Sequence, residues 1–238
     1  MIHMTAAELG DLANCLPEII AKHGIIVMDH IDLTNEGFMH LLVAAGDVVQ
    51  PYRQSVQSPV SVLDSSSTLP VEGGGELPFH RDGDSLDYLI DYVFLYCKEQ
   101  QGESSIYTTF VDYKGANAEL PGNIRSILGE RVFLTTFSGG NTVSYTPLCS
   151  ETGLLNLYFP GVRGSPWDTR IEGLDEQSSC IFFSELKTYY VNSKWFYRHS
   201  WVPGQLLIFD NIRYLHARER GSSFGRRVAW RGQVKSNS

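Results

Sequence analysis

The sequence predicts a mainly β protein with flanking helices, built as an antiparallel sandwich or barrel. Its 238 residues include 12 Tyr, 12 Phe and 22 Gly, a mixture that favours strands and turns over long helices. After Pro78, short apolar and aromatic runs alternate with Gly or Pro turns. Helical periodicity is strongest near the N-terminus, and strands that follow helices in this way are typical of a sheet structure with helices packed on one side.

The first fifty residues are expected to form a helical part that packs on the barrel. Apolar residues recur at helical spacing over residues 6–23, and Gly24 ends that helix. The apolar run 25–28 predicts a buried strand. Thr34 can cap a second helix, which includes residues 38–49. The Ser-rich residues 55–69 are expected to form a strand and a loop.

The later elements are predicted from short apolar runs and from the turns between them. Two helices are expected, near residues 122–128 and 185–192. The expected strands are 88–96, 104–111, 131–138, 154–159, 205–209 and 226–234. Because no internal repeat or boundary is evident, the chain is expected to be one domain over residues 1–238.

Composition and charge narrow the class of protein. Hydrophobic residues make up 42% of the chain and charged residues 19%, so a real core can form. The formal net charge of −8 argues against nucleic acid and anionic membranes as partners. The four cysteines show no C-x-x-C spacing, which argues against a zinc or redox motif. With no signal-like N-terminus and no apolar run of membrane length, a cytoplasmic location is expected.

Two histidines are followed, two positions later, by a carboxylate that could share a metal ion with them. With 27 acids in the chain, about one accidental match is expected among seven histidines. His30 and Asp32 lie between a buried strand and a helix cap, where a structural role is the better interpretation. His80 and Asp82 follow a Gly-rich stretch and precede an aromatic strand, a position that favours a ligand site.

A third metal ligand is available far downstream. The apolar run 206–209 leads through a polar turn to His216. Two imidazoles and one carboxylate form the facial triad of a non-haem Fe(II) oxygenase, which leaves three positions open. A hydrogen-bonded core histidine is the alternative interpretation of His216.

Two arginines on one strand face add a possible anion site. Arg227 and Arg231 share a face with Ala229 if residues 226–234 form a strand. A buried guanidinium can bind a carboxylate through two parallel hydrogen bonds, which a lysine cannot do. Solvent exposure of both arginines is the alternative.

These motifs together resemble the taurine dioxygenase and clavaminate synthase-like group of Fe(II)/2-oxoglutarate oxygenases, and the gamma-butyrobetaine hydroxylase branch is similar. The resemblance covers about residues 70–234. Its motifs are H-x-D at 80–82, FDNIRYLHAR at 209–218, the arginine pair 227 and 231, GES at 102–104, YTPLCSETG at 145–153 and YRHSWVPG at 197–204.

The resemblance implies a double-stranded β-helix, or jelly roll, that binds Fe(II) through His80, Asp82 and His216. It implies that Arg227 pairs with the distal carboxylate of 2-oxoglutarate, assisted by the hydroxyl of Ser104. Arg231 would contact substrate or support the ligands. The chain departs from the family pattern in its short length, in Ser104 where Thr is usual, and at residue 145, where Tyr replaces a frequent His.

The implied reaction uses O2 and 2-oxoglutarate to oxidise a C–H bond of a small molecule, such as an amino acid or a natural-product intermediate. Related halogenases replace the carboxylate ligand by a small residue, so Asp82 favours hydroxylation. Glu76 and Asp84 could bind an ammonium group, although exposed loop acids are the simpler interpretation. The alternatives are a non-catalytic jelly roll that binds a small ligand and a cupin-like hydrolase or isomerase. The sequence predicts no oligomeric state.

Overall fold

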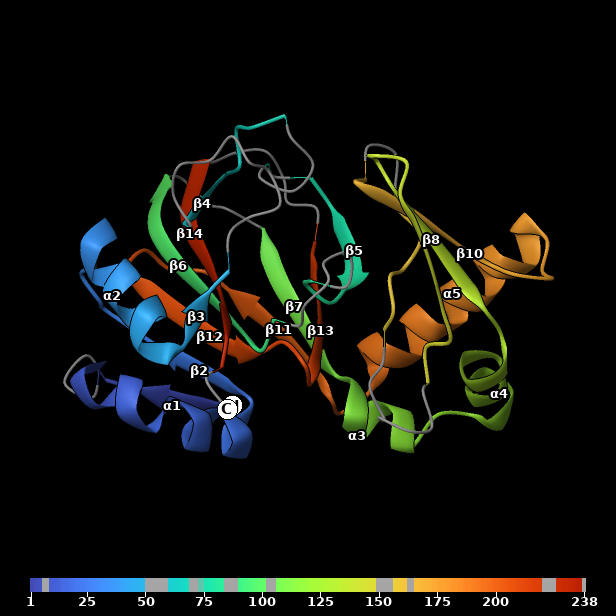
Figure 1. Ribbon diagram of the computed structural model, residues 1–238, viewed down its shortest axis with the longest axis horizontal. Coiled ribbons are helices and arrows are strands. Elements are labelled where there is room, and N and C mark those ends of the chain that lie inside the picture. The colour runs from blue at the N-terminus through green and yellow to red at the C-terminus, as the bar shows by residue number, and fades with distance from the viewer. Residues whose placement is uncertain are drawn as a thin grey trace.

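The structure is a computed structural model, and its largest element is a seven-stranded β-sheet (Figure 1). The structure describes residues 1–5, 9–49, 60–68, 73, 75–83, 90–101, 106–148, 156–161, 165–219 and 226–236. Every strand pair in the large sheet is antiparallel except β1 with β2. In order, its strands are β1 (Ile2–Met4), β2 (Ile25–Met28), β12 (Gln205–Asp210), β6 (Tyr92–Gln101), β14 (Arg226–Lys235) and β3 (Asp47–Val48), with β4 (Ser61–Asp64) also paired to β14.

A smaller antiparallel sheet faces the large one (Figure 1). Its order is β11 (Phe196–Ser200), β7 (Tyr107–Asp112), β13 (Tyr214–Arg218) and β5 (Leu77–His80). Val93 and Leu207 of the large sheet share one buried cluster with Phe110 and Tyr214 of the small sheet. The core of the molecule therefore lies between two sheets, as expected of a jelly roll.

Helices α1 (Leu9–His23) and α2 (Asn35–Ala45) cover the outer face of the large sheet. The Thr34 side chain caps α2 by accepting a hydrogen bond from Gly37 N at 3.0 Å, as predicted. The predicted helix was too long, because the chain leaves α2 at Gly46 and enters β3. Gly46 has φ 149°, and a Cβ there would collide with the Lys235 carbonyl.

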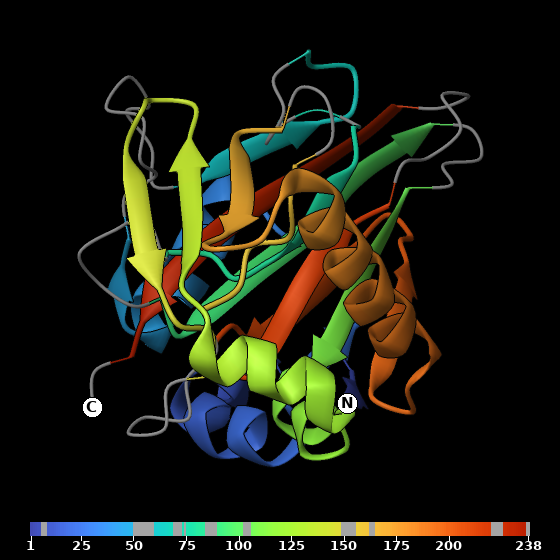
Figure 2. The same cartoon turned by 90° about the vertical axis from the view of Figure 1, so that its right-hand side faces the viewer.

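A second helical layer lies beyond the small sheet (Figure 2). Phe182 and Leu186 of its longest helix pack with Phe133 and with Leu215 of β13. The prediction of helices on one side was therefore wrong, since helices cover both outer faces. This layer contains α3 (Tyr113–Ala118), α4 (Gly122–Glu130), α5 (Glu176–Asn192) and a three-stranded sheet of β8 (Phe133–Phe137), β9 (Thr142–Tyr145) and β10 (Trp167–Ile171).

Several predicted elements differ from the observed ones. The predicted helix 185–192 is only the second half of α5, which begins after the cap residue Asp175. The strand predicted over 154–159 is absent from residues 156–159, while 154 and 155 lie outside the described residues. Of the strand predicted over 104–111, residues 107–111 belong to β7, and 104–105 are not described.

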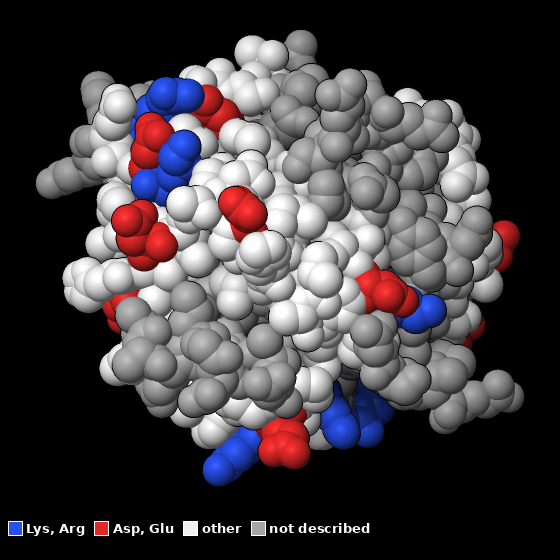
Figure 3. Space-filling model, turned by 60° about the vertical axis from the view of Figure 1, so that its left-hand side comes forward, with Lys and Arg blue, Asp and Glu red and all other residues white. Residues whose placement is uncertain are grey.

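Surface charges of both signs are interspersed. Figure 3 shows one face of the molecule, on which Lys and Arg side chains lie next to Asp and Glu side chains. Arg226, for example, pairs with Asp64 at 2.6 Å. No helix within the described part of the chain is both long enough and apolar enough to cross a membrane.

Candidate active site

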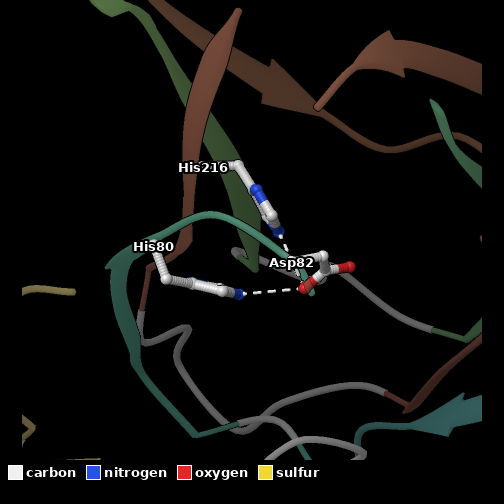
Figure 4. A group of neighbouring side chains, drawn as sticks. All are labelled: His80, Asp82 and His216. Carbon is white, nitrogen blue, oxygen red and sulfur yellow. Dashed lines mark ion pairs between the residues drawn. The ribbon is translucent and has the colours of Figure 1, made fainter. Parts of the chain in front are cut away.

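Strand pairing brings the two predicted histidine ligands together. His80 is the last residue of β5, and His216 lies in the middle of β13. The two residues are direct partners in the antiparallel ladder, and their ring centroids are 4.2 Å apart. Asp82 follows β5 in a turn, from which its carboxylate points back toward both rings (Figure 4).

The three side chains converge on one point. The Nε2 atoms of His80 and His216 lie 3.4 Å and 3.7 Å from the same atom, Oδ1 of Asp82. One donor atom from each residue lies within 4.8 Å of the other two, and all three residues are buried. Within the described ranges, no other group of three His, Cys, Asp or Glu side chains converges in this way. The geometry suits a single divalent ion that leaves coordination positions open.

The protonation states of these groups are those that a metal requires. His80 Nδ1 hydrogen-bonds the Pro78 carbonyl at 2.8 Å, so this nitrogen carries the proton and Nε2 is free to act as a ligand. Burial, together with His80, lowers the pKa of His216 to about 3 and keeps this imidazole neutral. Burial alone would raise the pKa of Asp82, but Arg231 and the two imidazoles outweigh it and hold that pKa well below its usual range.

The other side of Asp82 is fixed by hydrogen bonds. Its Oδ2 accepts a hydrogen bond of 2.6 Å from Gln233 Nε2, and Arg231 Nη1 lies 3.7 Å away. Its backbone N–H donates to Asn211 Oδ1 at 3.1 Å, while Asn211 Nδ2 donates to the carbonyls of Asp82 and Ile90. Asn211 is fully buried. Neither Gln233 nor Asn211 was predicted as a site residue from the sequence. The position of Gln233, two residues after Arg231, could have placed it on the same face of a strand.

A cavity between the sheets contains both histidines and a cluster of arginines. Arg227, Ala229 and Arg231 all line it, which confirms that they share one face of β14. Arg218 of β13 lines the same cavity. The remaining lining residues are Leu63, Leu77, Val93, Leu95, Thr108, Trp201 and Ala217.

Arg227 is a buried cation within these largely apolar walls. Its Nη1 donates to the Ile106 carbonyl at 3.4 Å, and its guanidinium lies 5.6 Å from the centre of the Trp201 ring. Burial lowers the pKa of Arg227 to about 10, so it stays charged near neutral pH. A buried guanidinium in this setting can bind a carboxylate.

Arg218 is a second buried arginine of the cavity, for which the sequence suggested no role. Its Nε donates to the Gly75 carbonyl at 2.6 Å. Burial first, and then the neighbouring charges of Arg227 and Arg231, lower the pKa of Arg218 to about 9. The cavity therefore gathers three arginine charges, of which Arg231 lies 3.7 Å from Oδ2 of Asp82.

Of the other predicted site residues, those that the structure describes do not line the cavity. Glu76 forms an ion pair of 3.4 Å with Lys187 of α5 and does not line the cavity. Ser104 and Asp84 lie outside the described residues. His30 and Asp32 are exposed, and His30 adopts a φ of 57° in a bend between β2 and α2, which agrees with the structural role inferred for them.

Comparisons with known proteins agree with this geometry. A family model described as "Taurine catabolism dioxygenase TauD, TfdA family" matches residues 6–233. The PvcB protein from Pseudomonas aeruginosa has a TM-score of 0.75 at 15% identity, over 94% of this chain and 80% of that chain. A taurine dioxygenase from Burkholderia xenovorans has a TM-score of 0.67 at 16% identity, over 98% and 82% of the two chains.

A third similar structure is AAD-2 in complex with Mn(II) and N-oxalylglycine. Its TM-score is 0.69 at 15% identity, over 95% of this chain and 88% of that chain. At such identities, these three structures show a shared fold, and they confirm the prediction of a mainly β jelly roll with helices.

Proposed function

The chain belongs to the TauD, TfdA family of Fe(II)- and 2-oxoglutarate-dependent dioxygenases, and from that premise we propose that His80, Asp82 and His216 hold its iron. The observation that carries this proposal is the convergence of both Nε2 atoms on Oδ1 of Asp82. Two imidazole nitrogens and one carboxylate oxygen fit Fe(II) in enzymes of this kind. The second polar atom of two of these ligands is also occupied, by Pro78 at His80 and by Gln233 at Asp82.

Arg227 would bind the distal carboxylate of 2-oxoglutarate. The support is its burial, its charge and its place in the same cavity as the histidines. The hydroxyl of Ser104 would donate a further hydrogen bond to that carboxylate, an assignment that rests on the family resemblance. The apolar side chains of Val93, Leu95 and Ala229 would exclude water around the bound cosubstrate.

Iron and 2-oxoglutarate together supply the oxidising power, because one atom of O2 enters succinate as CO2 is lost and the other enters the substrate. The protein's own residues bind and orient the reactants. His80 and His216, which are paired on adjacent strands, would each supply one ligand atom to the ion, and Asp82 in the turn after β5 would supply the third. Bound there, the ion would leave coordination positions for the cosubstrate and O2 next to the cavity that both histidines line, where the substrate would be held.

The reaction we propose is hydroxylation of a C–H bond in an amino acid or a natural-product intermediate. Asp82 favours hydroxylation over halogenation, since a carboxylate occupies the position that a halide would need. Arg231, which lines the cavity beside Asp82, would contact the substrate. Glu76 and Asp84, which flank the metal motif, are further candidates, and Glu76 would first have to leave Lys187.

A natural-product substrate has one further point of support. PvcB is described as an Fe, alpha-ketoglutarate dependent oxygenase from an isonitrile synthetic pathway. The alternative of a non-catalytic jelly roll is disfavoured by the complete set of three donor groups. A cupin-like hydrolase would need no 2-oxoglutarate and gives no reason for a buried Arg227.

Succinate release tests the proposal. Purified protein loaded with Fe(II) would be given 2-oxoglutarate, O2 and a panel of amino acids and amino-acid-derived metabolites. We expect succinate to form with iron, to increase with the correct substrate, and to accompany a product that has gained one oxygen atom from labelled O2. Absence of any iron-dependent conversion of 2-oxoglutarate, with or without a substrate, would contradict the proposal.

A further inference from the structure

We propose that Gln233 is a positioning residue, which holds Asp82 so that one carboxylate oxygen faces the metal and the other is turned away. The inference rests on the proposed function, since it assumes that Asp82 is a metal ligand. It concerns a residue of the large sheet, 151 positions away from Asp82 along the chain.

The contact itself is short and buried. Gln233 Nε2 lies 2.6 Å from Asp82 Oδ2, and both residues are 8% exposed. The two histidine Nε2 atoms, in contrast, face Oδ1. The two oxygens of the carboxylate therefore have different partners: Oδ1 faces the two histidines, and Oδ2 faces the amide of Gln233.

The position of Gln233 in the fold makes it a firm anchor. It lies on β14, where it pairs with Val93 of β6, and its carbonyl accepts a hydrogen bond of 2.8 Å from Val49 N. It follows Arg227, Ala229 and Arg231 at intervals of two residues, so its side chain points to the same inner face. The backbone on both sides of this glutamine is thus held in the sheet.

Asp82 needs such an anchor because it lies in a turn and not in a strand. Asn211 fixes its backbone, but the carboxylate can still rotate about its side-chain bonds. Arg231 Nη1, at 3.7 Å from Oδ2, is beyond hydrogen-bond distance. Among the described residues, Gln233 makes the one direct hydrogen bond to this oxygen.

The neutral amide also suits the ligand chemistry. A cation hydrogen-bonded directly to Oδ2, closer than Arg231 is, would draw negative charge away from the carboxylate and weaken its bond to the metal. An amide orients the oxygen while leaving that charge in place. Residues that orient metal ligands in this way typically contribute about 10–100-fold to metal affinity.

Metal affinity distinguishes positioning from simple filling of the core. Mn(II) binding would be measured without O2 for the wild type, Gln233→Leu and Gln233→Asn. Leu keeps the volume without the hydrogen bond, and Asn keeps an amide that is one methylene shorter and therefore makes a longer, weaker contact with Oδ2. We expect Gln233→Leu to bind Mn(II) about 10–100-fold more weakly, and Gln233→Asn to lie between it and the wild type.

Gln205→Leu is the matched control. Gln205 is a second buried glutamine, whose amide bonds His199 and Asp29 and no metal ligand. This variant should lose stability and keep its Mn(II) affinity.

A folded Gln233→Leu protein with wild-type Mn(II) affinity would overturn the inference and leave the proposed function intact. If Gln233→Leu does not fold, wild-type Mn(II) affinity in folded Gln233→Asn would overturn the inference instead. Wild-type protein that binds no Mn(II), or His216→Ala protein that binds it as tightly as the wild type, would remove the proposed function itself.

Discussion

At the scale of single residues, burial shifts the pKa values of His216 and Asp82 in opposite directions. It lowers the pKa of His216 to about 3, which keeps the imidazole unprotonated and ready for a metal. It would also protonate Asp82, were it not for Arg231 and the histidines, which together lower the pKa of Asp82 further than burial raises it. The site is therefore ready to bind a cation at neutral pH without first losing protons.

The two H-x-D motifs give a direct comparison between residues. His80→Ala should abolish metal binding and turnover, because two remaining ligands cannot hold the ion in a reactive geometry. His30→Asn should keep both, since His30 is exposed and Asn tolerates its φ of 57°. Calorimetric titration with Mn(II) checks both variants. Loss of metal binding in a folded His30→Asn protein would mean that the wrong motif has been assigned.

Substitutions of Arg227 test the binding of 2-oxoglutarate separately from the binding of the metal. Removing the partner of a buried carboxylate costs about 3–5 kcal/mol, so Arg227→Ala should raise the apparent Michaelis constant for 2-oxoglutarate at least about a hundredfold. Arg227→Lys should recover only part of this loss, because an ammonium cannot make the paired contact. Iron affinity should barely change in either variant.

Arg231→Ala is the control for this experiment. Arg231 lies beside Asp82 and should affect substrate coupling more than 2-oxoglutarate affinity. If Arg231→Ala destroys 2-oxoglutarate affinity and Arg227→Ala does not, the two roles are reversed.

The ligand trio could be predicted from the sequence, but its supports could not. Spacing and the family resemblance were enough to group His80, Asp82 and His216. The hydrogen bond from Gln233 joins residues 151 positions apart, and nothing in a glutamine on a buried strand indicates which acid it will meet. Asn211 belongs to the motif FDNIRYLHAR, yet nothing in that motif indicates that its side chain will bond the backbone of Asp82 and Ile90.

At the scale of elements, two of the strands that carry functional residues, β5 and β13, were not predicted, whereas β14 was predicted to within one residue. The strand β12 is an unbroken apolar run, and its predicted range 205–209 differs from the observed one by a single residue. The strands β5 and β13 were missed because His80, His216 and Arg218 interrupt their apolar pattern. Polar residues at inward-facing positions weaken the periodicity from which strands are recognised.

Asn211, in the turn between β12 and β13, should contribute strongly to the free energy of unfolding. Asn211→Ala removes the acceptor for Asp82 N and the donor to the carbonyls of Asp82 and Ile90, all of them buried. Since each unsatisfied buried group costs about 1–3 kcal/mol, we expect the free energy of unfolding to fall by at least about 3 kcal/mol.

Denaturant unfolding measures this loss. Asn192→Ala, which removes one exposed hydrogen bond at the end of α5, should lower stability by less than about 1 kcal/mol. Equal effects of the two variants would show that Asn211 is no special anchor.

The strand β11 carries a buried histidine that should make stability depend on pH. His199 bonds Tyr197 and Gln205, and burial is the main cause that lowers its pKa to about 4. The unfolded chain, with an ordinary histidine pKa of about 6.5, binds the proton first as the pH falls. Stability from His199 is therefore complete above about pH 6.5 and is lost toward pH 4, at about 1.4 kcal/mol per pH unit.

Unfolding of the metal-free protein at pH 7 and pH 5 checks this dependence. His199→Gln, which keeps a hydrogen-bonding side chain that does not titrate, should show a smaller loss of stability between the two pH values. Identical losses in the wild type and His199→Gln would exclude His199 as a cause.

At the scale of the whole molecule, the site lies between two sheets, and each sheet has helices on its outer face (Figures 1 and 2). Composition and turn spacing were enough to predict a mainly β fold. The helical layer beyond the small sheet could not be placed from the sequence. The pattern of α5 shows that one face is buried, but not that this face meets Phe133 and Leu215.

Iron held by His80, Asp82 and His216 should drive the conversion of 2-oxoglutarate. The most direct measurement adds O2 to Fe(II)-loaded protein with 2-oxoglutarate and compares succinate formation in the wild type and in folded His216→Ala. The wild type should form succinate in an amount equal to the 2-oxoglutarate that it consumes, and His216→Ala should form none. Equal iron-dependent succinate formation by the two proteins would contradict this expectation.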